Sequence, residues 1–173
     1  MRRALLAGVL LVVGTGCASQ VELTTPLDPQ EYATCPGRGV NVITGSTFGK
    51  TAGGDVISAA GRIVHLDKMT KYAFATYSAI DKKQNKDGAF AAQNESDTVM
   101  MDRTMFKCRR NATVGPDGNF HFNDVATGEY FVSTYMSRMN KTGQWSGIWN
   151  VTRISVRDGQ PLEPLVLYGF HQS

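Results

Sequence analysis

Residues 117–130 of this 173-residue chain read DGNFHFNDVATGEY and carry its strongest structural signal. Phe120 and Phe122 alternate with His121, so in a strand the two rings point to one face and the imidazole to the other. Proline and glycine within residues 115–118 are typical of the turn that precedes such a strand. The stretch therefore predicts a turn followed by a strand whose aromatic face enters a core.

Short segments of the same kind recur along the chain, separated by turns that contain Gly, Pro or Asp. The predicted strands cover residues 40–50, 59–66, 103–114, 119–123, 129–138, 148–156 and 164–168. Residues 69–96 follow neither the strand nor the helix period and are interpreted as one irregular insertion with room for a short helix. This pattern predicts an all-β fold, a single antiparallel β-sandwich of about seven strands.

The first seventeen residues indicate where the protein goes. Two arginines precede the apolar run 4–13, and small residues lead to Cys17, which is the layout of a secretory leader too short to span a bilayer. A cysteine at this place resembles the bacterial lipoprotein signal, although Gly14 stands where Leu or Val is usual. The resemblance implies removal of residues 1–16 and acylation of Cys17, for example with palmitate. Cleavage near Ala18 by an ordinary signal peptidase is the alternative.

Composition limits the class of partner. Loss of the two leader arginines lowers the net charge from +3 to +1, and a near-neutral chain in this compartment argues against nucleic acid. In lipoproteins that the leader resembles, Ala18 after the cysteine implies the outer membrane, facing the periplasm or the cell surface. Residues 17–39 are polar and proline-punctuated and predict a lipidated N-terminus with a flexible tether. Residues 40–173 are the predicted folded domain.

Two cysteines follow Cys17 in the sequence. Because the predicted compartment is oxidising, a disulfide between Cys35 and Cys108 is the first hypothesis. A buried free Cys108 with an exposed free Cys35 is the alternative.

Residues 117–125 and the following Gly-Glu-Tyr-Phe-Val at 128–132 are similar to the signature of carboxypeptidase regulatory-like domains. These are transthyretin-like (prealbumin-like) β-sandwiches. Asp67 and Lys71 stand where that family usually has prolines, and Ala126-Thr127 replaces a common Pro-Pro. The resemblance implies a β-sandwich over residues 40–173 that serves as a scaffold or accessory module and carries no catalytic motif.

Side chains able to hold a metal are few. His65, His121 and His171 are the only imidazoles, and their spacing does not match the ligands of one metal, although His65 and His121 could meet across strands. We expect solvent-facing strand histidines, with no metal site and no cofactor.

Carboxylate pairs are the remaining catalytic candidates. Asp97 with Asp102, or Asp117 with Asp124, could be brought together by folding, but glycine and asparagine neighbours indicate turn residues. The sequence contains no nucleophile elbow and no phosphate-binding loop. No catalytic residue is predicted.

Aromatic residues of the last third of the chain are the candidate binding residues. Trp145, Trp149 and Tyr135, together with Tyr168, lie on or near the ends of predicted strands, where exposed rings can stack on a sugar or on an apolar partner surface. Burial of the tryptophans in the core is the alternative. Together these features predict a non-enzymatic, lipid-anchored envelope protein that acts as a binding or structural accessory module for glycan or envelope proteins.

Two other classes of protein stay open. One is a hydrolase or carbohydrate-active protein that uses loops of residues 69–96. The other is a subunit of a secretion or conjugation apparatus.

Overall fold

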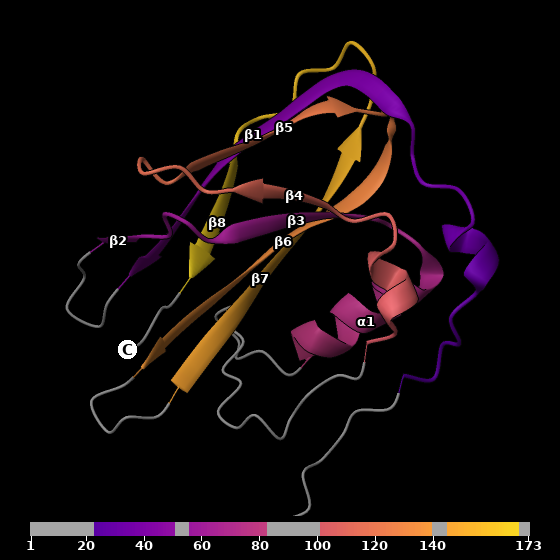
Figure 1. The fold of residues 1–173 in the computed structure, drawn as a ribbon, viewed down its shortest axis with the longest axis horizontal. Helices are drawn as coiled ribbons and strands as arrows, with labels where there is room; N and C mark the ends of the chain where they lie inside the picture. Colours follow the sequence, from indigo (N-terminus) through magenta and orange to yellow (C-terminus); the bar gives the residue numbers. More distant parts are fainter. Residues whose placement is uncertain (1–22, 51–55, 83–100, 140–144, 170–173) are drawn as a thin grey trace, which may run out of the picture.

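The computed structural model describes residues 23–50, 56–82, 101–139 and 145–169, which form two β-sheets and a helical layer (Figure 1). The strands are β1 (Arg38–Lys50), β2 (Val56–Ser58), β3 (Ile63–Lys68), β4 (Arg110–Thr113), β5 (Asn119–Val125), β6 (Gly128–Met139), β7 (Trp145–Val156) and β8 (Leu165–Gly169). The helices are α1 (Lys71–Lys82) and two short 3-10 segments, η1 (Pro29–Tyr32) and η2 (Arg103–Phe106).

The two sheets confirm the predicted all-β sandwich. Strands β2, β1, β5 and β8 make one sheet, here called the β1 sheet, and strands β4, β3, β6 and β7, in that order, make the other, the β6 sheet. One pairing differs from the antiparallel prediction, because β8 runs parallel to β1 from Gly45↔Leu165 to Gly49↔Gly169. The chain crosses from β7 in the β6 sheet to β8 in the β1 sheet, so direction is not fixed by a hairpin there.

The core between the sheets contains the aromatic strand. Phe120 and Phe122 are buried and their rings meet edge to face, whereas His121 is exposed, as the alternation predicts. Val64, Leu66, Val132 and Ile154 of the β6 sheet complete this core from the opposite side.

The outer face of the β6 sheet is partly covered by a second layer. Here α1, η1 and η2 pack on the sheet through a cluster of buried side chains, the helical cluster, made of Tyr32, Tyr72, Ala73, Tyr77, Met105 and Phe131. Residues 71–82 of the expected irregular insertion are therefore a helix, and residues 83–100 lie outside the described part of the chain.

Two predicted strands are shorter than expected. Asp102 caps η2 by accepting a hydrogen bond from the Thr104 amide at 2.8 Å, so only Arg110–Thr113 of the predicted strand 103–114 is extended. Residues 59–62 turn through Gly61, whose φ of 77° suits glycine, and strand β3 begins at Ile63.

The predicted flexible tether is wrong for residues 23–39. Leu23 and Leu27 pack on the helical cluster, and Tyr32 is 1% exposed with its hydroxyl 2.5 Å from Thr70 Oγ1. Asp28 caps η1 by accepting from the Gln30 amide. The apolar anchors are too widely spaced to form a period, which is why the sequence pattern misses them; residues 17–22 lie outside the description.

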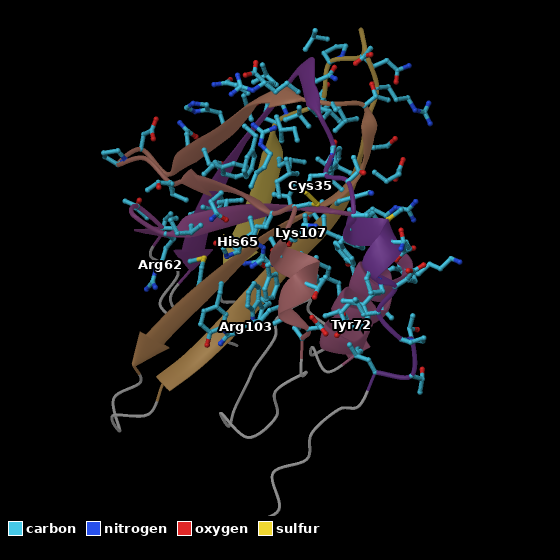
Figure 2. All side chains as sticks on the ribbon, turned by 45° about the vertical axis from the view of Figure 1, so that its right-hand side comes forward. Cys35, Arg62, His65, Tyr72, Arg103 and Lys107 are labelled. Carbon is cyan, nitrogen blue, oxygen red and sulfur yellow. A yellow bond between two sulfur atoms is a disulfide. The ribbon has the colours of Figure 1, made fainter. Side chains whose placement is uncertain are left out.

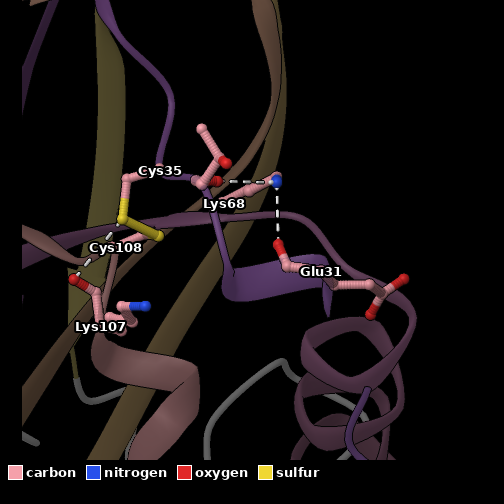
Figure 3. The surroundings of a disulfide bond; sticks show 6 residues. Glu31, Cys35, Lys68, Lys107 and Cys108 are labelled. Carbon is pink, nitrogen blue, oxygen red and sulfur yellow. Dashed lines mark hydrogen bonds between the residues drawn. A yellow bond between two sulfur atoms is a disulfide. The ribbon is translucent and has the colours of Figure 1, made fainter. Parts of the chain in front are cut away.

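A disulfide joins this N-terminal segment to the turn before β4. Cys35 and Cys108 are bonded across a sequence separation of 73 residues (Figure 3), in place of the alternative of two free thiols. Beside it, Lys68 Nζ donates to the carbonyl oxygens of Glu31 at 2.9 Å and Thr34 at 3.4 Å. The segment is thus held covalently and by hydrogen bonds.

A buried ion pair lies between the helical layer and the β6 sheet. Arg109 donates through Nε and Nη2 to the two carboxylate oxygens of Asp67, each at 2.8 Å. The Tyr77 hydroxyl donates to Asp67 Oδ2 at 2.5 Å, and burial, with the charge of Asp67 beside it, raises the pKa of Tyr77. Asp67 therefore links the β6 sheet to α1 through Tyr77 and to the segment between η2 and β4 through Arg109.

Candidate functional site: the open end of the β6 sheet

Within the described ranges, the helical layer covers one end of the outer face of the β6 sheet and leaves the other end open. Tyr72, the second residue of α1, lies at the covered end, whereas His65 and Arg62 lie toward the other end (Figure 2). At that uncovered end Ile63 is 40% and Tyr135 is 38% exposed. Side chains of β4, β3, β6 and β7 meet here, and we call this surface the open platform: Ile63, His65, Asn111, Tyr135 and Trp149.

Strand register brings the platform residues together. Tyr135 of β6 pairs directly with Trp149 of β7, and His65 of β3 pairs with Asn111 of β4 on one side and with Ser133 of β6 on the other. Directly opposite residues on one face of a sheet have side chains in contact range. Because four hydrogen-bonded strands supply these residues, the platform is a rigid surface.

The aromatic rings of the platform form a continuous surface. The centroids of Tyr135 and Trp149 are 5.2 Å apart with the planes inclined at 45°, and the imidazole of His65 lies 6.4 Å from Trp149. Trp149 and Val151 also pack on the edge of the helical cluster. Such spacing is that of interacting aromatic pairs.

A polar pair borders the rings. His65 Nδ1 lies 2.8 Å from the Asn111 side-chain oxygen, and since an amide oxygen only accepts, Nδ1 is the donor. Burial lowers the pKa of His65, so the ring is neutral at neutral pH and Nε2 is an acceptor. The platform therefore combines flat apolar faces with a directed acceptor.

The structure brings two of the three predicted binding residues together and does not describe the side chain of the third. Tyr135 and Trp149 are adjacent on the platform, as proposed from their strands. Trp145 pairs through its backbone with Met139 at the far end of β7, and its side chain lies outside the described part of the structure. Sequence reasoning missed His65 and Asn111: alternation along β3 places His65 outward, but only the strand order shows that it lies beside Trp149.

The histidine pair considered as a metal site does not form. His65 is in the β6 sheet and His121 is in the β1 sheet, so they do not face each other across strands, and His171 lies outside the described residues. Within the described ranges no group of three or more His, Cys, Asp or Glu side chains is arranged to hold a metal ion. Over the same ranges, no helix has the length and apolar character that crossing a bilayer requires.

The candidate catalytic carboxylates that the structure describes bond to backbone amides or to an arginine. Asp117 accepts a hydrogen bond from the Asn119 amide and Asp102 accepts one from the Thr104 amide, and these bonds lower the pKa of each. Asp124 is the penultimate residue of β5 and pairs with Arg38. Since Asp117 precedes β5 and Asp124 lies near its other end, about 20 Å of extended chain separates them and they are not a catalytic pair. Asp97 lies outside the description.

Comparison with known proteins adds a fold relationship. No family model matches the chain, and no curated protein matches it either. Among solved structures, a protein from Pseudomonas aeruginosa described as a "putative carbohydrate binding protein" is similar, with a TM-score of 0.65 and 21% sequence identity. The likeness covers 83% of this chain and 98% of that one, and at this identity it shows that the two chains share a fold.

Proposed function

We propose that the chain is a non-enzymatic, glycan-binding accessory module of the bacterial envelope and that the open platform is its binding surface. The observation that carries the proposal is the pair formed by the exposed Tyr135 and the half-buried Trp149, beside the His65–Asn111 hydrogen bond. The structural neighbour described as a "putative carbohydrate binding protein" has the same fold, which supports a glycan as ligand. The resemblance to carboxypeptidase regulatory-like domains supports an accessory rather than a catalytic role.

Sugar chemistry fits the platform. A pyranose ring has an apolar face of C–H groups that stacks on an aromatic ring, and hydroxyls at its edge that need hydrogen-bond partners. Trp149 and Tyr135 offer the stacking faces, and Nε2 of His65 accepts from a hydroxyl. The platform is a surface formed by strands rather than an enclosed cavity of the kind that holds a small molecule. We therefore expect an oligosaccharide or polysaccharide ligand.

Replacing Trp149 by alanine should weaken glycan binding by about 2 kcal/mol, roughly thirtyfold in Kd, because it removes the larger stacking face. The measurement is isothermal titration with the best ligand from an array of envelope glycans, supported by a melting curve since Trp149 also packs on the helical cluster. Tyr135→Ala, at a more exposed position, should weaken binding with little loss of stability.

Tyr168→Ala is the matched control, because Tyr168 is 61% exposed on the β1 sheet, away from the platform. It should leave Kd unchanged. Equal losses for Trp149→Ala and Tyr168→Ala, or none for either platform variant, would show that the platform is not the binding surface.

We further propose that Cys17 carries the lipid that holds the module at the outer membrane. Support comes from the leader: charged start, apolar run, small residues and the cysteine that follows them. Several acyl chains together give stable anchoring where a single chain does not.

Substituting Cys17 by serine should move the protein from the membrane fraction to the soluble periplasmic fraction. Fractionation with immunoblotting is the measurement, and metabolic labelling with an alkynyl palmitate should mark the wild-type chain only. Persistence of Cys17→Ser in the membrane fraction would refute the lipid anchor.

A further inference from the structure

We propose that the α1 side of the domain rests on the phospholipid bilayer to which Cys17 is anchored, with Phe74 in the interface and Lys71 at the headgroups. This inference depends on the lipid anchor of the proposed function but not on glycan binding. It concerns a groove of about 610 Å³ beside α1, whose lining includes Thr25, Glu31, Met69, Lys71, Phe74 and Ala75.

Chain length limits which face can reach the membrane. Only five residues lie between Cys17 and Leu23, so even a fully extended linker, six residue-to-residue steps long, spans about 20 Å. Leu23 packs on the helical cluster, and the first described residues run on the same side of the molecule as α1 (Figure 1). A domain of this size measures about 35–40 Å across. The linker is therefore too short for the outer face of the β1 sheet to lie on the bilayer.

The groove has the chemistry of an interfacial surface. Phe74 is 49% exposed although its helix neighbours Tyr72, Ala73 and Tyr77 are buried against the sheet. Lys71, one turn before it on α1, is exposed at the start of the helix. An apolar ring flanked by a flexible cation is the arrangement with which helices contact headgroups and the acyl boundary.

An acceptor in the groove also lacks a partner. Glu31 Oε1 lies 3.4 Å from the backbone nitrogen of Lys71, whereas Glu31 Oε2 is buried and has no hydrogen-bond partner among the described residues. Buried polar atoms normally find a partner. If the half-buried Glu31 side chain turns toward the groove, the ammonium group of phosphatidylethanolamine can donate to this oxygen while its phosphate meets Lys71, so a zwitterionic headgroup matches the two charges.

Fluorescence quenching by brominated lipids tests the orientation. The acylated, mature protein is reconstituted in vesicles of phosphatidylethanolamine and phosphatidylglycerol, with and without brominated acyl chains. Both native tryptophans are replaced by phenylalanine, and one new tryptophan is introduced as Phe74→Trp or, as the matched control on the β1 sheet, Tyr168→Trp. We expect position 74 to lose most of its emission to the brominated lipid and position 168 to keep its emission.

The outcomes separate this inference from its premise. If the wild-type protein does not float with the vesicles, the lipid anchor fails and the orientation fails with it. If the protein floats but the two positions are quenched equally, or only position 168 is quenched, the anchor stands and the orientation is overturned. Glycan binding is measured on soluble Cys17→Ser protein and is unaffected by either result.

Discussion

Replacing Arg109 by methionine should lower the free energy of unfolding by about 3–5 kcal/mol, because it leaves the Asp67 carboxylate buried without its cation. Asp67 is 1% exposed, and its oxygens accept two bonds from Arg109 and one from Tyr77. After the substitution, the Tyr77 hydroxyl is the one donor to this charge that remains among the described residues. Urea denaturation of Cys17→Ser protein, followed by tryptophan fluorescence, measures the loss.

Arg153→Met is the matched control for that substitution. Arg153 bonds Glu129 at 3.2 Å, but the two side chains are 55% and 37% exposed, so water screens the pair. Its loss should lower stability far less than Arg109→Met does, because exposed ion pairs contribute little. The double variant Asp67→Leu/Arg109→Met, which removes both charges, should recover part of the stability lost in Arg109→Met. Similar losses for Arg109→Met and Arg153→Met would contradict the assignment of a buried pair.

Removing the disulfide should have an effect of similar size. Cys35→Ala/Cys108→Ala opens a loop whose ends are 73 residues apart, and the chain entropy of such a loop corresponds to about 4 kcal/mol. The N-terminal segment with Tyr32 and Leu27 should then detach more readily from the helical cluster. Denaturation midpoints and hydrogen exchange of the Tyr32 amide measure the two effects.

Reductant provides the control for the disulfide variant. Dithiothreitol should lower the midpoint of the wild-type domain to that of the double variant and leave the double variant unchanged. If the denaturation midpoint of the wild-type domain does not change with reductant, and the double variant has the same midpoint, the disulfide contributes nothing to stability.

Local periodicity made much of the sandwich predictable. Phe120 and Phe122 face the core because side-chain direction alternates in a strand, and the same rule places β1, β6 and β7 near their predicted residues. The predicted strand 103–114 is longer than β4 because the β-branched and aromatic residues after Asp102 resemble a strand. They hide the fact that Asp102 caps the helix η2. The parallel direction of β8 follows from the crossover of the chain between the two sheets. The residues of β8 themselves do not encode this direction.

Long-range pairing made the platform only partly predictable. Tyr135 and Trp149 could be predicted because they lie on consecutive strands, whose antiparallel register places them directly opposite each other. His65 and Asn111 join them only through the order β4-β3-β6-β7, and no local pattern encodes that order. The covered end of the same sheet was missed for a similar reason, since Tyr32, Tyr77 and Arg109 come from three separate segments of the chain.

The most direct test of the glycan-binding platform is a nuclear magnetic resonance titration of labelled, mature Cys17→Ser protein with the best-binding oligosaccharide. We predict that the ligand changes the chemical shifts of four groups on the platform: the Trp149 indole, the Tyr135 ring, the His65 imidazole and the Asn111 side-chain amide. The chemical shifts of Tyr168 and His121 on the β1 sheet should not change. Saturable shifts confined to the β1 sheet, or no shifts with any envelope glycan, would contradict the account.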